Sequence, residues 1–198
     1  MLTKIQAEIM KVFASDINGD FSIKQISERT RKPYPLIHRA VKDLVSKSYL
    51  LKDKIKILGL NYKKNVPEIA YIESLRTNER LEKDKTIGLF VEDVISRIKA
   101  DLLVFLFFGS YIEKINPRDI DLLLILNNGH EVEDAEKFIR NLASNFSYKF
   151  DINVISKESA QEMLRKREEK NVLNETINKH LIVFGAENYY RILSNARQ

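Results

Sequence analysis

Two neighbouring stretches decide the fold: the chain reads LFFGS at residues 106–110 and PRDIDLLLIL at residues 117–126. The first is typical of an apolar strand that ends in a Gly-Ser turn. The second opens with Asp119 and Asp121 and continues without polar alternation, which predicts a strand buried on both faces. Because residues at i and i+2 of a strand point to one side, we expect the two carboxylates to project together.

The carboxylates would repel each other in this partly desolvated place unless a cation lay between them. Oxygen ligands with no Cys or His nearby favour Mg²⁺ over zinc. Gly109 and Ser110 offer backbone N–H groups and a hydroxyl to an anion such as phosphate. A third acid, Asp151, lies in the strand-like run KFDINVI at residues 149–155. These features together predict a site for a nucleoside triphosphate and Mg²⁺.

The order of an apolar-Gly-Ser turn, a short spacer, an Asp-x-Asp strand and a later acidic strand resembles a known family. It is similar to the nucleotidyltransferase superfamily related to DNA polymerase beta, especially its minimal nucleotidyltransferase branch. The resemblance covers about residues 86–195. It implies a small mixed-sheet fold in which Asp119, Asp121 and Asp151 are catalytic and hold two Mg²⁺ ions.

The same resemblance implies that Gly109 and Ser110 contact the triphosphate. Lys114 and Arg118 are close enough along the chain to reach its phosphates as well. The chain departs from the family pattern here, because many members carry Arg-Gly soon after Gly-Ser and a serine before the first aspartate. These departures bear on triphosphate affinity and on the choice of acceptor.

The reaction that the resemblance implies is transfer of a nucleoside monophosphate from a triphosphate, with ATP expected, to a hydroxyl acceptor. The minimal branch indicates a protein hydroxyl on a toxin-like partner, while RNA ends and small molecules such as aminoglycosides stay open. The alternative is a non-catalytic, nucleotide-sensing transcriptional regulator that binds DNA.

The N-terminal part of the chain is strongly basic. Residues 1–64 hold 14 Lys and Arg against 6 Asp and Glu, a net charge of +8, whereas the whole chain has a net charge of +5. This asymmetry predicts two domains with different partners, the first of them suited to nucleic acid. We therefore expect a domain at residues 1–64, a linker helix at 65–85 and the nucleotidyltransferase domain at 86–198.

The apolar pattern of the basic segment predicts three helices and a hairpin. Ser22 is a candidate N-cap for a short second helix, and a third helix is expected from Pro35 to Lys47. Residues 50–58 read as two short strands about a turn at Asp53-Lys54. This order resembles a winged helix-turn-helix, so the fold class expected for the chain is mixed α/β (α+β).

In that interpretation the third helix enters the major groove of duplex DNA and the wing contacts phosphate or the minor groove. The residues expected to bind DNA are Arg31, Lys32, His38, Arg39, Lys42, Lys52, Lys54 and Lys56. A solvated charged surface, or a winged helix used for dimerisation or protein docking, remains the alternative. A homodimer is left open.

Composition limits the other classes. The chain has 198 residues, is 44% hydrophobic and 31% charged, and contains no cysteine, which excludes disulfides and thiolate metal sites. The N-terminus does not read as a signal peptide, and no apolar run is long enough to span a bilayer. We expect a cytoplasmic protein with no membrane partner.

Overall fold

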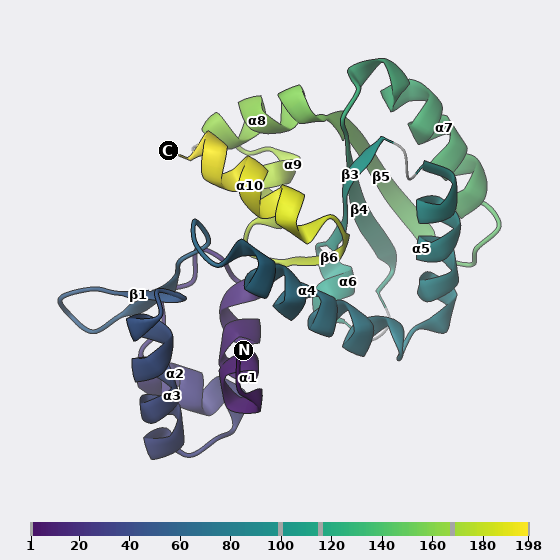
Figure 1. Cartoon of the computed structure of the whole chain (residues 1–198). Coiled ribbons are helices and arrows are strands. Elements are labelled where there is room, and N and C mark those ends of the chain that lie inside the picture. The colour runs from purple at the N-terminus through teal and green to yellow at the C-terminus, as the bar shows by residue number, and fades with distance from the viewer. Residues whose placement is uncertain (1, 99–100, 115–116, 167–168, 198) are drawn as a thin grey trace.

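The computed structural model describes residues 2–98, 101–114, 117–166 and 169–197. Figure 1 shows an N-terminal group of helices with a two-stranded hairpin, followed by a four-stranded sheet with helices on both faces. The chain is therefore mixed α/β, which confirms that part of the expected fold class. Among the described residues, none of the helices has the length and the apolar run that crossing a bilayer would require.

The N-terminal group follows the order predicted from the sequence. Its elements are α1 (Lys4–Ala14), α2 (Ile23–Thr30), α3 (Tyr34–Ser46), β1 (Leu50–Lys52) and β2 (Leu58–Leu60). Thr3 and Ser22 each form a capping box at the start of a helix, the second as predicted. Strands β1 and β2 pair antiparallel, and Phe21 bridges to Leu58, which ties the hairpin to the helices.

The C-terminal sheet is mixed and has the order β5-β4-β3-β6. Its strands are β3 (Leu102–Phe108), β4 (Asp119–Leu126), β5 (Lys149–Ser156) and β6 (His180–Phe184). Strand β4 runs parallel to β5 and antiparallel to β3, which runs antiparallel to β6. Residues 122–126 of β4 have no exposed surface, so the prediction of a strand buried on both faces is confirmed.

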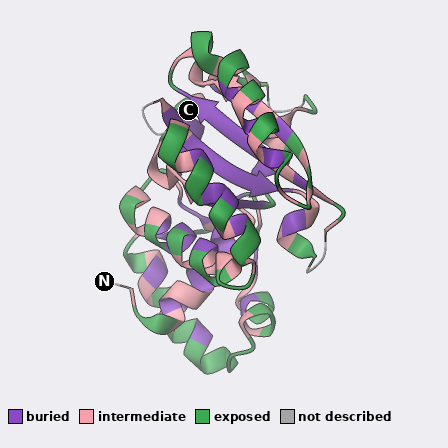
Figure 2. Ribbon diagram, turned by 90° about the vertical axis from the view of Figure 1, so that its right-hand side faces the viewer, coloured by how far each residue is buried: buried purple, intermediate pink, exposed green. Residues whose placement is uncertain are grey.

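Helices cover both faces of this sheet, and Figure 2 shows the buried strands between them. One face carries α5 (Lys85–Ile98) and α7 (Val132–Ala143); the other carries α4 (Val66–Leu81), α8 (Lys157–Arg165) and α10 (Ala186–Ala196). Three short helices, α6 (Ser110–Glu113), η1 (Gly129–Glu131) and α9 (Val172–Thr176), complete the described elements.

Helix α4 joins the two parts of the molecule. It packs against α1 of the N-terminal group and against β6 and α10 of the C-terminal part. Ile69 and Ile72 are fully buried, and one continuous hydrophobic cluster extends from Phe13 and Leu44 to Leu106 on the sheet. Most of the predicted linker helix at residues 65–85 is thus a packed core element, and α5 begins at its last residue.

Candidate nucleic-acid interface

Helix α3 presents an apolar face to the core and a polar face to solvent. The polar face carries His38, Arg39 and Lys42, all of them exposed. The ring of Tyr34 stacks on that of His38, with centroids 6.1 Å apart. The inward side chains recur at helical spacing and are Ile37, Val41 and Leu44. The residues of α3 that were predicted to face DNA are therefore exposed to solvent and not part of the core.

The turn between α2 and α3 is fixed by local hydrogen bonds. Arg31 ends α2 in the left-handed conformation, with φ 53°, and its N–H donates to Glu28 O. The Lys32 N–H donates to Ser27 O at 3.1 Å, and the Ser27 hydroxyl donates to Lys32 O at 2.6 Å. Both basic side chains of the turn are exposed and lie directly before α3.

The wing differs in detail from the prediction. The hairpin loop spans residues 53–57, so the turn is longer than the Asp53-Lys54 turn expected from the sequence. Asp53 closes this wing loop, because its N–H donates to Ile57 O and its carboxylate accepts from Ile57 N–H at 2.7 Å. Lys52, Lys54 and Lys56 are exposed, and Ile55 at the tip is 78% exposed.

These residues form one basic face, defined as Arg31, Lys32, His38, Arg39, Lys42, Lys52, Lys54 and Lys56. His38, Lys42 and Lys52 line a common groove of about 320 Å³ where α3 meets β1. Figure 1 shows α3 and the wing loop on the side of the molecule away from the C-terminal sheet. Within the described residues, no side chain of the basic face forms an ion pair. Phosphates could therefore be bound without breaking an internal pair.

The acidic residues of the sheet come together at one end of β4 and β5. The strand register places Asp121 beside Asp151 and Asp119 beside Lys149. The Lys149 ammonium lies 3.2 Å from Asp119 Oδ1, so one of the three predicted Mg²⁺ ligands already has a protein cation. No three acidic or histidine side chains of the described residues are grouped as a metal site requires. The donor set does not fit the predicted pair of Mg²⁺ ions, and that expectation is corrected.

Gly109 and Ser110 are also used within the chain. Gly109 has φ 63°, and a side chain there would collide with Asp121 Oδ2, so the glycine makes room for that carboxylate. The Ser110 hydroxyl donates to Asp119 O at 3.0 Å. Lys114 and Arg118 lie on exposed positions beside α6 and β4.

Replacing Asp121 by asparagine is expected to raise the melting temperature slightly at neutral pH. Burial raises the pKa of the Asp121 carboxyl, and the charges of Asp151 and Asp119 add to this effect. A raised folded-state pKa means that the carboxyl favours folding at low pH, and this contribution is lost as pH rises through the folded pKa. The gain should stay below about 1 kcal/mol, because water screens a partly exposed carboxylate.

Thermal unfolding followed by circular dichroism at pH 7 and pH 4 measures this effect, which should shrink at the lower pH. Asp93→Asn, at an exposed position on α5, is the control and should leave the melting temperature unchanged. A lower melting temperature for Asp121→Asn at pH 7 would contradict the expectation.

Sequence analysis missed a buried polar cluster between α4, β6 and α10. Glu73 is fully buried and accepts from Tyr190 Oη at 2.7 Å and from Arg76 Nη1 at 2.5 Å. His180 is also fully buried, with Nε2 3.1 Å from Glu73 Oε1 and Nδ1 2.7 Å from Thr176 O. The sequence held one sign of this cluster, because Glu73 lies among the apolar residues of the helix predicted after Pro67.

Three solved structures match this chain over about three fifths of its length. HmgR from Pseudomonas aeruginosa has a TM-score of 0.30 and 12% identity, covering 61% of this chain and 45% of that chain. An IclR homologue from Microbacterium sp. strain HM58-2 has a TM-score of 0.29 and 17% identity, covering 60% and 44%. An IclR homologue from Microbacterium hydrocarbonoxydans, complexed with 4-hydroxybenzoate, has a TM-score of 0.29 and 16% identity, covering 61% and 45%.

The chain thus spans less than half the length of the structures that it matches. No family model matches it, and no curated protein matches it.

The nucleotidyltransferase assignment is corrected, because no family model matches the chain and the described residues contain no group of three side chains that could hold a metal ion. The matched structures are HmgR and two IclR homologues, and none of them is named as a nucleotidyltransferase. The predicted family, the transferase activity and the ATP and Mg²⁺ requirement are corrected, and no comparison supports the toxin-like partner. The local reason is that Asp119 is paired with Lys149, while Gly109 and Ser110 serve Asp121 and the β4 backbone.

Proposed function

We propose that this protein is a DNA-binding regulator of transcription that acts in the cytoplasm. Residues 1–64 serve as a winged helix-turn-helix that binds duplex DNA, and the C-terminal sheet serves as a regulatory part without turnover. The observation that carries this proposal is the basic face, whose side chains lie on α3, its preceding turn and the wing and form no ion pair with any residue that the structure describes.

In the proposed complex α3 lies in the major groove. Arg39 and Lys42 are exposed on its outer side and have the reach and the donors to contact base edges, guanine above all. Arg31 and Lys32, at the start of the helix, contact phosphates that position it. The wing lysines follow the neighbouring backbone, and Ile55 at the wing tip is the apolar side chain nearest the minor groove.

The C-terminal part is connected to α3, the helix proposed to read DNA, through the packing of α4 on α1. Helix α4 contacts α1, which packs on α3, and Lys11 of α1 forms ion pairs with Glu8 and with Glu79 of α4. A displacement of α4 by an event on the sheet would therefore be transmitted to the orientation of α3. This packing supports a regulatory role for the sheet.

The test is binding of the full chain to labelled duplex DNA, followed by fluorescence anisotropy at several salt concentrations. If roughly four to six phosphates are neutralised, log K should fall with log salt at a slope of about −4 to −5. Arg39→Ala should cost about 1–3 kcal/mol on the preferred sequence and much less on unrelated DNA, if this residue reads a base. Binding that does not depend on salt would contradict the proposal.

Arg31→Gly is expected to change stability and DNA binding in opposite directions. Glycine adopts φ 53° without the strain of a side chain, so the free energy of unfolding should rise by up to about 1 kcal/mol. Loss of one phosphate contact should reduce the salt slope by about 1. Urea unfolding and anisotropy measure the two effects, and Lys137→Gly on the exposed face of α7 should lower stability and leave DNA binding unchanged.

A further inference from the structure

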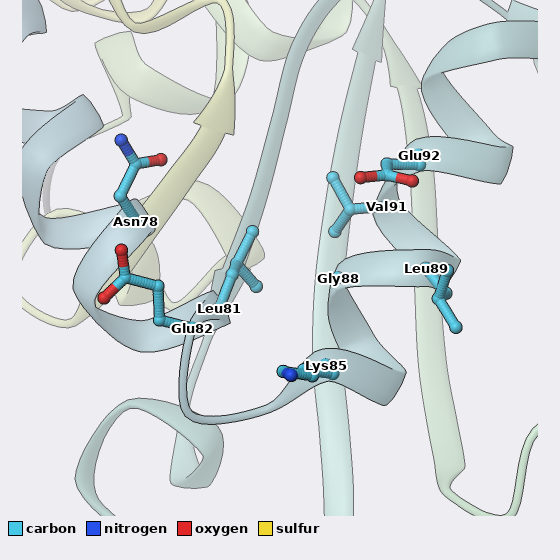
Figure 3. A pocket seen from close by; sticks show the side chains of 8 residues that line it. All are labelled: Asn78, Leu81, Glu82, Lys85, Gly88, Leu89, Val91 and Glu92. Carbon is cyan, nitrogen blue, oxygen red and sulfur yellow. The ribbon is translucent and has the colours of Figure 1, made fainter.

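The outer face of α5 carries an exposed apolar residue between opposite charges. Leu89 is 60% exposed, with exposed Lys85 one turn before it and exposed Glu92 one turn after it. Together with the end of α4 they line an open groove of about 520 Å³ (Figure 3). The inner face of the same helix, with Ile87, Phe90 and Val94, is buried on the sheet. The groove therefore lies on the solvent side of a firmly anchored helix.

Gly88, beside Leu89, is not required by any contact with the described part of the chain. It lies in the second turn of α5, where glycine is less favourable than any residue except proline. A Cβ built there would have no atom of the described residues within 4 Å, so their packing does not require its absence. Glycine in such a position allows another backbone or side chain to approach the helix closely.

We propose that this face of α5 binds the α5 of a second copy of the chain, antiparallel and about a twofold axis. With the axis between residues 88 and 89, Leu89 of each copy lies over Gly88 of the other. The same axis brings Lys85 of each copy opposite Glu92 of the other, so two pairs of opposite charges face each other across the interface. A parallel pairing would instead place lysine against lysine, which charge repulsion disfavours.

The use of this dimer rests on the proposed function, since paired winged helices read two half-sites of an operator. The association itself can be measured without DNA. Sedimentation velocity of the full chain should show a concentration-dependent dimer. Leu89→Glu should abolish it, whereas Leu51→Glu, the same change at a 57% exposed leucine of the N-terminal hairpin, should leave it intact.

Two further variants test the geometry. Lys85→Glu should weaken the dimer by about 10-fold, and the double variant Lys85→Glu with Glu92→Lys should restore it, because both pairs are then re-formed with reversed signs. Gly88→Ala should weaken the dimer while raising the melting temperature, since alanine favours the helix and its Cβ meets no atom of the described residues of the monomer.

A wild type that stays monomeric at high micromolar concentration would overturn the proposal, as would a dimer unaffected by Leu89→Glu. Failure of the double variant to restore association would exclude the antiparallel register. None of these outcomes bears on the binding of one copy to a single DNA half-site. That binding is measured separately and tests the proposed function. If the chain dimerised but showed no salt-dependent DNA binding, the proposed function would be wrong and the proposed dimer surface on α5 would still hold.

Discussion

Glu73→Gln is expected to lower the free energy of unfolding by about 3–5 kcal/mol, because it removes one partner from a buried ionic cluster. Arg76 and His180 would then lie in the interior without their carboxylate. The two ring nitrogens of His180 face Thr176 O and Glu73 Oε1, so the substitution also disturbs the hydrogen bonding of this buried ring. Removal of the negative charge therefore leaves the Arg76 guanidinium, whose side chain is 9% exposed, without its counter-charge.

Urea unfolding followed by circular dichroism measures this loss. Glu79→Gln on the same helix is the matched control, since Glu79 is paired to Lys11 but its side chain is 59% exposed. Its cost should stay below about 1 kcal/mol. Equal effects for the two variants would show that the buried cluster does not stabilise the fold.

The stability that Glu73 provides should depend on pH. Burial alone raises the pKa of the Glu73 carboxyl, but the charges of Arg76 and His180 and the hydrogen bonds outweigh it, so the pKa lies below its ordinary value. A depressed folded-state pKa gives stability that is present above the unfolded pKa, about 4.3, and is lost as pH falls through the folded pKa. The difference between wild type and Glu73→Gln should therefore narrow in strong acid.

Replacing Lys52, Lys54 and Lys56 together by alanine should weaken DNA binding by about 100-fold near physiological salt. Each lysine is exposed on the wing and has no internal ion pair among the described residues, so each is available to release counterions from DNA. The salt slope should flatten by about 3, roughly one for each lysine, and the loss should be similar for all sequences.

The matched control replaces three other exposed lysines, Lys83, Lys137 and Lys170, which lie outside the N-terminal group. Net charge falls by the same amount, so a general electrostatic effect would weaken binding equally in both variants. A specific interface requires that the control keep most of the affinity and the slope. Equal losses would contradict a wing that contacts DNA.

Local patterns predicted the elements well. The uninterrupted apolar run of β4 indicated its burial on both faces, and Ser22 indicated the start of α2. Both signals depend on neighbours along the chain. The wing was less predictable, because Asp53 closes a longer loop through a side-chain hydrogen bond that composition does not reveal.

The roles of site residues were harder to predict, because they depend on distant partners. Glu73 meets His180 and Tyr190 across 107 and 117 residues of sequence, and no periodicity records such contacts. At the end of the sheet, Asp121 lies beside Asp151 and next to Gly109, three residues that the Gly-Ser and Asp-x-Asp pattern had singled out. The pattern could not show that Lys149 balances Asp119 or that Gly109 makes room for Asp121.

The hydrophobic cluster that runs from α1 and α3 through α4 to the sheet makes a cut after residue 64 costly. Such a truncation would expose the sides of α1 that pack on α4, and would sever the bonds from Ile17 N–H to Ile177 O and from Lys63 Nζ to Arg197 O. Heating should accordingly melt the whole chain in a single cooperative transition, with no stage at which the N-terminal helices survive alone. A chimaera that grafts these helices onto another protein would have to carry α4 with them.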